Sequence, residues 1–293
     1  RKQENYGYDA LGRLDRMTDG TSALIVDYDY DSAGRIINKA LGNGVYTTYA
    51  FDSAGRLTTL SNLKPDDSLL RRFAYTYDAS GRVKSITSTY AADDPRTSGT
   101  ETYTYDNLGQ LTQVHYPGGR VVEYHYDAVG NRTHVVDNGV TTTYAVNNMN
   151  QYTAVGGATY TFDADGNMTS KSDGGVTTTY TYDTENRLAK VEQGPTGQPV
   201  TDTWTYTYDA LGNRVGSSHN GTPTRYVIDP VGYGNVAAEY SGSGTLVAGY
   251  SHGYGLTSQH DSAGDEGFYA FDAIGSTTDV TDAAGTSLNR YTY

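Results

Sequence analysis

A short motif recurs along the whole chain at a nearly constant spacing. It consists of an aromatic residue, any residue, a second aromatic residue, an aspartate, two variable residues and a glycine, as in "YTYDALGNRV" from Tyr206 and "YAFDSAGRL" from Tyr49. The commonest step between successive aspartates is 20 to 22 residues. Self-similarity at a fixed period of this length is the signature of a repeat architecture. We therefore expect the chain to be an array of one small structural unit.

The second aromatic residue, the aspartate and the glycine of each copy define the structural repeat positions. These positions are Tyr8, Asp9, Gly12, Tyr30, Asp31, Gly34, Phe51, Asp52, Gly55, Tyr77, Asp78, Gly81, Tyr105, Asp106, Gly109, Tyr126, Asp127, Gly130, Phe162, Asp163, Gly166, Tyr182, Asp183, Tyr208, Asp209, Gly212, Asp229, Gly232, Phe271, Asp272 and Gly275. A degenerate copy has Asn147 and Asn150 at the aspartate and glycine positions, and Asn186 replaces the glycine of another copy. "YSHGYG" at residues 250–255 marks a further copy in the long gap between Asp229 and Asp272.

Each copy reads as a β-hairpin. In "TTTYTYD" (177–183) tyrosines and threonines alternate, which places Tyr180 and Tyr182 on one face of a strand. The D-x-x-G that follows is typical of a turn, in which Asp binds the backbone and Gly accepts a positive φ. A second turn signal, such as Asn43-Gly44, closes most periods. The pattern predicts an all-β chain of tandem antiparallel hairpins that form a curved or spiralling ribbon. Only "DDSLLRRFAY" from Asp66 is compatible with a short turn of helix.

Arginines follow many of the turns in register. They are Arg13, Arg35, Arg56, Arg82 and Arg187. We expect each to pair with a neighbouring aspartate, so that the pairs form a ladder along the ribbon. Exposed pairs of this kind contribute only about 0 to 1 kcal/mol each, so they indicate register and not a binding site.

Composition excludes several classes of function. Tyr occurs 29 times, against 5 Phe and 1 Trp, which suits wide, half-hydrated surfaces better than one thick apolar core. The formal net charge of -13, with no basic stripe, argues against a nucleic-acid partner and against anionic membrane surfaces. No apolar run is long enough for a membrane span, and the absence of Cys excludes disulfides and thiolate metal sites.

Two matches to enzyme motifs are weak. "GYSHG" at 249–253 fits the Gly-x-Ser-x-Gly nucleophile elbow, but the Gly-rich sequence after Ser251 has no helical period and His260 follows too closely. "GYGNVA" at 232–237 fits a dinucleotide fingerprint, but the residues after it alternate like a strand, where a helix is required. We interpret both as coincidences of glycine-rich turns.

Two acidic segments have the residue types of metal sites without the spacing. The segment with His252, His260, Asp261, Asp265 and Glu266 has no paired spacing that would place its ligands on one side of an element, so a solvated loop is favoured. "DADGNM" from Asp163 begins like a calcium loop, but its glycine falls at the fourth position instead of the sixth. We expect no metal site and no cofactor.

The repeated Y-x-Y-D-x-x-G units resemble the YD repeats of bacterial Rhs proteins, which are shared with the C component of Tc toxins and with animal teneurins. The resemblance covers essentially the whole chain. We divide it into a repeat array at 1–221 and, at 222–293, last repeats that resemble the first half of the Rhs-associated core and continue the array. "RYVIDPVGYGNVAAEY" and "FYAFDAIGSTTDVTDAAGTSLNRYTY" carry this second resemblance.

The resemblance implies a hollow β-shell that encloses a toxic C-terminal segment until delivery. Family members of this kind usually cut themselves after the core, at aspartates in a motif ending in Asp-Pro-x-Gly-Leu. Asp272, Asp279 and Asp282 precede the region that would match, so no catalytic role is carried over to them and we do not expect an enzyme. The implied partners are the remaining repeats and the C-terminal toxin segment of the same polypeptide, with a secretion-system or delivery protein as a further partner.

Two functional classes remain open at this point. In the first, the chain is a structural segment of an encapsulating shell, secreted or displayed at the cell surface after export. In the second, the same ribbon is a cell-surface or secreted adhesion module whose tyrosine rows recognise glycans or a partner protein. For the shell we expect an open section whose inner face carries Tyr, Thr and Ser around a hydrated cavity.

Overall fold

The protein is all-β. The computed structural model describes residues 3–229 and 234–291, in which 27 strands form an antiparallel sheet that is not closed. One short 3-10 turn, η1 (Pro117–Gly119), accompanies them. The predicted fold class is confirmed. Among the described residues, no helix has the length and apolar character needed to cross a membrane.

The chain divides into two compact units. Unit 1 comprises Arg1–Thr102 and Leu246–Tyr293, and unit 2 comprises Tyr103–Thr245. This division is based on contacts in space. The predicted boundary between residues 221 and 222 is based on the sequence of the repeats, so the division does not test it and it stays a prediction.

Unit 1 contains the first and the last strands of the chain. The first strands are β1 (Glu4–Tyr8), β2 (Leu14–Asp19), β3 (Leu24–Tyr30), β4 (Ile36–Leu41), β5 (Tyr46–Phe51), β6 (Leu57–Leu63), β7 (Leu69–Tyr77) and β8 (Val83–Tyr90), and β9 (Gly99–Tyr105) runs on into unit 2. The last strands are β23 (Leu246–Gly253), β24 (Gly255–His260), β25 (Glu266–Phe271), β26 (Thr277–Thr281) and β27 (Ser287–Arg290). From β1 to β9, and again from β23 to β27, each strand pairs with the next one in the chain.

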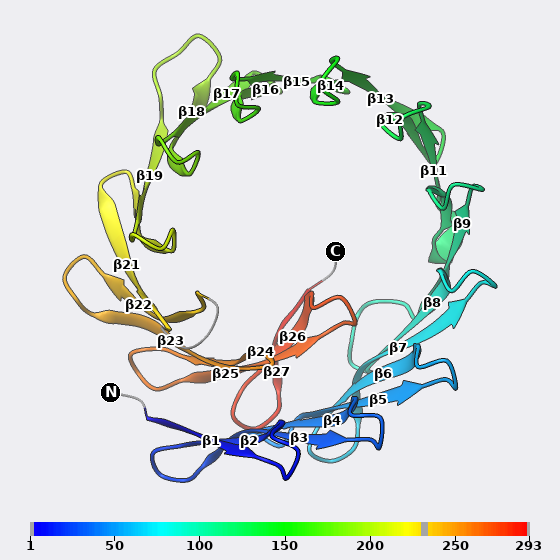
Figure 1. Ribbon diagram of the computed structural model, residues 1–293, viewed down its shortest axis with the longest axis vertical. Coiled ribbons are helices and arrows are strands. Elements are labelled where there is room, and N and C mark those ends of the chain that lie inside the picture. The colour runs from blue at the N-terminus through cyan, green and yellow to red at the C-terminus, as the bar shows by residue number, and fades with distance from the viewer. Residues whose placement is uncertain (1–2, 230–233, 292–293) are drawn as a thin grey trace. The chain divides into compact units, whose positions relative to one another are not determined.

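Unit 2 is a single layer of hairpins. Its strands are β10 (Leu111–His115), β11 (Val121–Tyr126), β12 (Arg132–Asp137), β13 (Val140–Val146), β14 (Tyr152–Val155), β15 (Ala158–Phe162), β16 (Met168–Asp173), β17 (Val176–Tyr182), β18 (Leu188–Pro195), β19 (Asp202–Tyr208), β20 (Arg214–His219), β21 (Thr222–Ile228) and β22 (Val236–Ser241). These strands follow an arc, coloured green to yellow in Figure 1. A twisted sheet of this length curls. The predicted curvature is therefore present in this unit.

The D-x-x-G segment forms the same turn throughout the array. In the turn after β19, one carboxylate oxygen of Asp209 accepts the backbone N–H groups of Leu211 and Asn213, at 2.9 Å each. Gly212 has φ 85°, in the left-handed region that favours glycine. Asn150 and Asn186 adopt φ 59° and 58°, which confirms that asparagine replaces glycine there. Gly232 lies outside the described residues.

The second aromatic residue of the motif joins consecutive repeats. Its strand carries a β-bulge at this position, for example between Thr207 and Tyr208. The Tyr208 hydroxyl donates a hydrogen bond of 2.8 Å to the carbonyl oxygen of Leu188 in the preceding repeat. The guanidinium of Arg187 lies 4.8 Å from the centroid of the Tyr208 ring. One side chain thus provides a hydrogen bond and a cation-π contact between two repeats.

The arginines that follow the turns form ion pairs, each within its own turn. Arg187 pairs with Asp183, four residues earlier in the same turn, at 2.7 Å. Arg13, Arg35, Arg56 and Arg82 pair in the same way with the aspartates of their own turns. The expected pairing with a neighbouring aspartate is therefore confirmed, and that aspartate belongs to the same turn as the arginine. The link to the next repeat is the aromatic ring that the arginine covers.

Unit 1 has a dry core, which the expectation of a hydrated inner face missed. Strands β23 to β27, orange to red in Figure 1, lie against the sheet of β1 to β7. Leu14, Met17, Ile25, Val26, Tyr28, Leu41, Val45, Leu70 and Phe268 form the buried cluster. Phe268 comes from β25 and the others come from the first 70 residues, so the returning strands supply the cover. A single-layer hairpin array cannot bury an apolar face of its own.

Two further interpretations of the sequence change. The segment from Asp66 is not helical: Asp67 has φ 65° in a turn and Leu69–Tyr77 is strand β7. Asp261 and Asp282 form D-x-x-G turns with the same hydrogen bonds, but these turns connect β24 to β25 and β26 to β27, at the opposite edge of the hairpins. The copy expected at "YSHGYG" is confirmed as the tight hairpin of β23 and β24.

Tyr208→Phe tests the joint between repeats. The substitution removes the hydroxyl and keeps the ring beneath Arg187, so we expect the local stability of β18 to β20 to fall by about 0.5 to 1.5 kcal/mol. Native-state hydrogen exchange at these strands measures the change. Tyr206→Phe is the matched control, because no hydrogen bond is formed by that hydroxyl within the described residues. Equal rates of hydrogen exchange in β18 to β20 of the two variants would show that the Tyr208 hydroxyl does not stabilise the contact between these repeats.

Candidate functional site

A row of side chains crosses unit 1 beneath the returning strands. Directly paired positions on six adjacent strands carry Tyr28, Lys39, Thr47, Asn62, Arg71 and Tyr90, which we call the buried row. The strands run from β3 to β8, and the four central residues are polar and buried. Buried polar groups are costly unless they find partners, so this row is the most demanding part of the fold.

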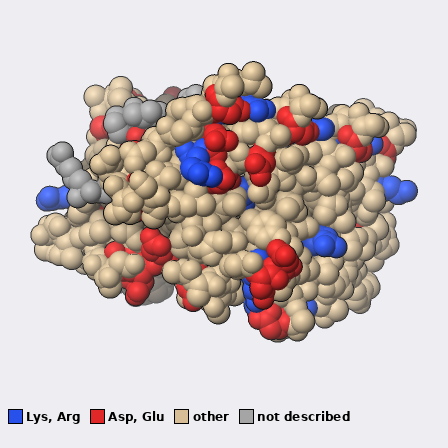
Figure 2. All heavy atoms as spheres, turned by 90° about the horizontal axis from the view of Figure 1, so that it is seen from below, with Lys and Arg blue, Asp and Glu red and all other residues tan. Residues whose placement is uncertain are grey.

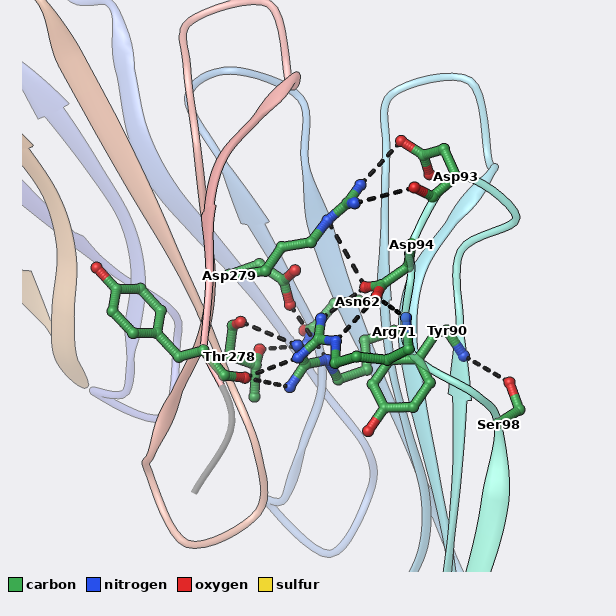
Figure 3. A network of polar contacts seen from close by, with 11 residues as sticks. Asn62, Arg71, Tyr90, Asp93, Asp94, Ser98, Thr278 and Asp279 are labelled. Atoms are coloured by element: carbon green, nitrogen blue, oxygen red, sulfur yellow. Dashed lines mark hydrogen bonds and ion pairs between the residues drawn. The ribbon is translucent and has the colours of Figure 1, made fainter. Parts of the chain in front are cut away.

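Most partners of the buried row come from β26 and its neighbours. Asn62 accepts a hydrogen bond from Thr47 at 2.7 Å and donates to the carbonyl oxygen of Phe271 at 3.1 Å. Arg71 donates to the carbonyl oxygens of Thr278 and Tyr291, at 3.1 Å each. Figure 3 shows Thr278 and Asp279 directed toward Arg71 from the returning strand. The contacts with Phe271, Thr278 and Tyr291 join residues that are 207 to 220 positions apart in the sequence.

Asp279 and Arg71 form a buried ion pair with imperfect geometry. Oδ2 of Asp279 lies 3.4 Å from Nε of Arg71, and their side chains are 1% and 5% exposed. Neither carboxylate oxygen accepts a hydrogen bond from a described residue. Burial raises the pKa of Asp279, although the charge of Arg71 opposes that shift. Burial likewise lowers the pKa of Arg71. The pair therefore specifies how the two layers meet more than it stabilises them.

A second ion-pair cluster adjoins the first. Arg96 makes a bidentate pair with Asp94, with N–O distances of 2.9 and 2.6 Å, and also donates to the carbonyl oxygen of Tyr291 at 2.8 Å. Arg290 of β27 reaches Asp93 at 2.8 Å and Asp94 at 3.6 Å. The hydrogen bonds from Arg96 lower the pKa of Asp94 to about 2. The loop after β8 is thus attached to the end of the returning strands.

Two more contacts fix the returning strands at the other end of the row. The Tyr28 hydroxyl accepts the N–H of Tyr254 at 2.9 Å, and the two rings meet edge to face at 5.2 Å. A Cβ at Gly253 would lie 2.3 Å from that hydroxyl, so only glycine fits there. Asn43 donates to the Thr281 hydroxyl at 2.9 Å and to the Asp282 carbonyl oxygen at 2.7 Å.

The sequence-predicted candidates fall in ordinary structural positions. Asp272 and Asp282 accept backbone N–H groups of their own turns. Ser251 is buried in β23 and is followed by strand β24, so the nucleophile-elbow interpretation lacks its helix. Among the described residues, no group of three or more His, Cys, Asp or Glu side chains has the arrangement of a metal site.

The buried row was missed by the sequence reasoning. One signal was present: Arg71 alternates with Phe73 and Tyr75, so it shares their face of the strand. An arginine on the same strand face as aromatic residues is expected either to be exposed to solvent or to pair with a buried partner. The partner, Asp279, lies on a strand that no sequence periodicity pairs with β7.

Charges elsewhere are mixed. On the face drawn in Figure 2, acidic side chains lie beside basic ones. Ion pairs within turns, such as Arg56 with Asp52, and between strands, such as Arg16 with Asp27, also bring opposite charges together.

Replacing the two members of the buried ion pair is expected to have unequal effects. Arg71→Met leaves the Asp279 carboxylate buried without a counter-ion, which costs about 3 to 5 kcal/mol of unfolding free energy. Asp279→Asn leaves the Arg71 guanidinium with its hydrogen bonds to two carbonyl oxygens, so its cost is expected to be smaller than that of Arg71→Met. Urea denaturation at pH 7 followed by near-ultraviolet circular dichroism compares them. Arg16→Met, in an exposed pair, is the control, and an Arg71→Met loss no larger than the control would contradict the assignment.

Acid is expected to loosen the loop after β8. Because the pKa of Asp94 is about 2 in the folded protein against 3.8 ordinarily, its contribution is present above pH 3.8 and is lost as the pH falls toward 2. The contribution is on the order of 2 kcal/mol. Asp279 has the opposite sign, since its pKa is raised: it favours folding most below pH 3.8 and less as the pH rises. Asp94→Asn should flatten the decline in stability between pH 4 and 2, and the exposed Asp15→Asn should leave it unchanged.

Comparison with known proteins places the chain in a family. The family profile described as Teneurin YD-shell matches residues 55–177, and the profile described as RHS Repeat matches residues 30–64 and 162–199. A search of curated proteins gives no significant match.

Solved structures share the fold. The Tc holotoxin pore of Photorhabdus luminescens aligns over 99% of this chain and 16% of its own, with a TM-score of 0.75 and 19% identity. TcdB2-TccC3 aligns over 99% of this chain and 17% of its own, with a TM-score of 0.67 and 18% identity. TcdB2-TccC3 without its hypervariable C-terminal region aligns over 99% and 16%, with a TM-score of 0.62 and 18% identity. This chain thus spans about one sixth of the solved chains that it matches. With its tandem Y-x-Y-D-x-x-G hairpins, the chain is an RHS/YD-repeat protein, related to the teneurin YD-shell and sharing its β-sheet fold with part of the Tc toxin component TcdB2-TccC3.

Proposed function

We propose that this chain is a segment of an encapsulating shell in a bacterial toxin of the RHS/YD-repeat type. In this proposal it sequesters a C-terminal toxin segment of the same polypeptide until delivery outside the producing cell. The observation that carries the proposal is the fold match over 99% of the chain to Tc toxin components, one of which has a hypervariable C-terminal region.

The architecture supports a mechanical role. The single-layer arc of unit 2 has few buried apolar residues among those described, with Val114, Val122 and Ala158 as examples, so most of its side chains remain available to solvent or cargo. Unit 1 is doubled by the returning strands, and the buried row holds its two layers together. A wall of this kind excludes proteases by its continuous hydrogen-bonded backbone and requires no reacting group. Catalysis is accordingly not part of the proposed role.

Protection of the downstream segment tests the proposal. The complete polypeptide that contains this chain and its C-terminal segment is treated with thermolysin, and cleavage of that segment is followed by mass spectrometry. We expect cleavage to be at least tenfold slower than for the segment produced alone. Arg71→Glu places a carboxylate against Asp279, so it should separate β26 from β7 and restore cleavage, whereas Arg16→Glu should not.

If thermolysin cleaved the segment at the same rate in the complete polypeptide and on its own, the proposed encapsulating role would be wrong. If the intact protein also bound glycan or cell-surface protein, that result would favour the adhesion module instead. Peptides from unit 2 that remain resistant in Arg71→Glu show that the loss of protection is local to unit 1.

A further inference from the structure

Unit 1 contains a cavity beside the buried row. Its volume is about 500 Å³, and both layers contribute to its wall. Tyr49, Phe51 and Leu57 line it from the first sheet, and Leu256 and Phe271 line it from the returning strands. Cavities of roughly 300 to 1,000 Å³ with mainly apolar and aromatic walls and a few polar groups are typical of small-molecule sites.

Lys39 lines the cavity and is the one cation of the buried row without a counter-ion among the described residues. Its side chain belongs to a residue that is only 7% exposed, and no described residue forms a hydrogen bond or an ion pair with Nζ. Arg71, three strands along in the same row, has Asp279 and two carbonyl oxygens. Nζ of Lys39 instead lies 5.2 Å from the centroid of the Phe271 ring.

The surroundings of Lys39 disfavour its charge. Burial lowers the pKa of Lys39 to about 8, so near neutral pH most molecules still carry the ammonium. A ring face compensates an ammonium only partly, because it provides no hydrogen-bond acceptor. A desolvated ammonium in an aromatic cavity is therefore complementary to a ligand that brings both an anion and an apolar ring.

We propose that this cavity binds a small aromatic monocarboxylate, with the carboxylate on the Lys39 ammonium and the ring among Tyr49, Phe51 and Phe271. Asp272 also lines the cavity, and one of its oxygens accepts the N–H groups of Ile274 and Ser276. Its negative charge disfavours ligands with a second carboxylate. The site does not include the Arg71–Asp279 ion pair, and it goes beyond the encapsulating role.

Calorimetric titration with 2-naphthoate and with its neutral analogue 2-naphthamide tests the proposal. The wild-type chain should bind naphthoate at least tenfold more tightly than naphthamide, a preference of about 1.4 kcal/mol. Lys39→Gln should abolish the preference and retain weak binding of both probes. Lys84→Gln, which removes an exposed lysine of β8, should preserve the preference.

A cavity-filling change separates the site from adventitious binding. Leu256→Trp should eliminate binding of both probes while the near-ultraviolet circular dichroism stays native-like. Equal affinities for naphthoate and naphthamide in the wild-type chain would overturn the proposal without recourse to any variant. Absence of naphthoate binding, or naphthoate binding that survives in folded Lys39→Gln, would overturn it as well.

Discussion

The second aromatic side chain of each motif holds successive hairpins together. Tyr77, Tyr126, Tyr182 and Tyr208 each donate a hydroxyl hydrogen bond to a carbonyl oxygen in the preceding repeat, at 2.6 to 3.0 Å. Where Phe51 occupies this position, the ring still lies 4.4 Å from the guanidinium of Arg35. A hairpin that buries little surface alone is thereby fixed to its neighbour. This joint gives the tyrosine at the second aromatic position a structural role that its hydroxyl and its ring share.

Because these contacts link each hairpin to its neighbour, unit 2 can consist of a single layer of strands. In unit 1 the returning strands β23 to β27 form a second layer. In unit 2 each repeat contacts its neighbours along the chain, as in other repeat proteins. In unit 1, β23 to β27 cover the first sheet and complete a dry core around Met17, Val26 and Tyr28. The layers meet through polar as well as apolar groups. Arg71 and Asp279 restrict how β26 sits on β7, since any other alignment leaves a buried charge unpaired.

The buried row contains two cations, Arg71 and Lys39, and their surroundings differ. Arg71 is neutralised by the returning strand, and its forked guanidinium also satisfies two backbone carbonyl groups. Lys39 faces an aromatic ring and open volume instead. The same covered face therefore contains a structural contact and a cavity suited to a ligand.

The sequence by itself determined the repeat, the hairpins, their turns and the all-β class, because each depends on residues within about 22 positions of one another. Asp209 and Gly212 specify their turn wherever the array is placed. The tertiary structure alone decided that β26 covers β7, that Lys39 and Arg71 share a buried row, and that unit 1 has a dry core. Antiparallel hairpins repeat the same local pattern in every copy, so nothing in that pattern states which distant copies pack face to face. That choice depends on the shape and charge complementarity of surfaces about 200 residues apart, which form only when the chain folds back on itself.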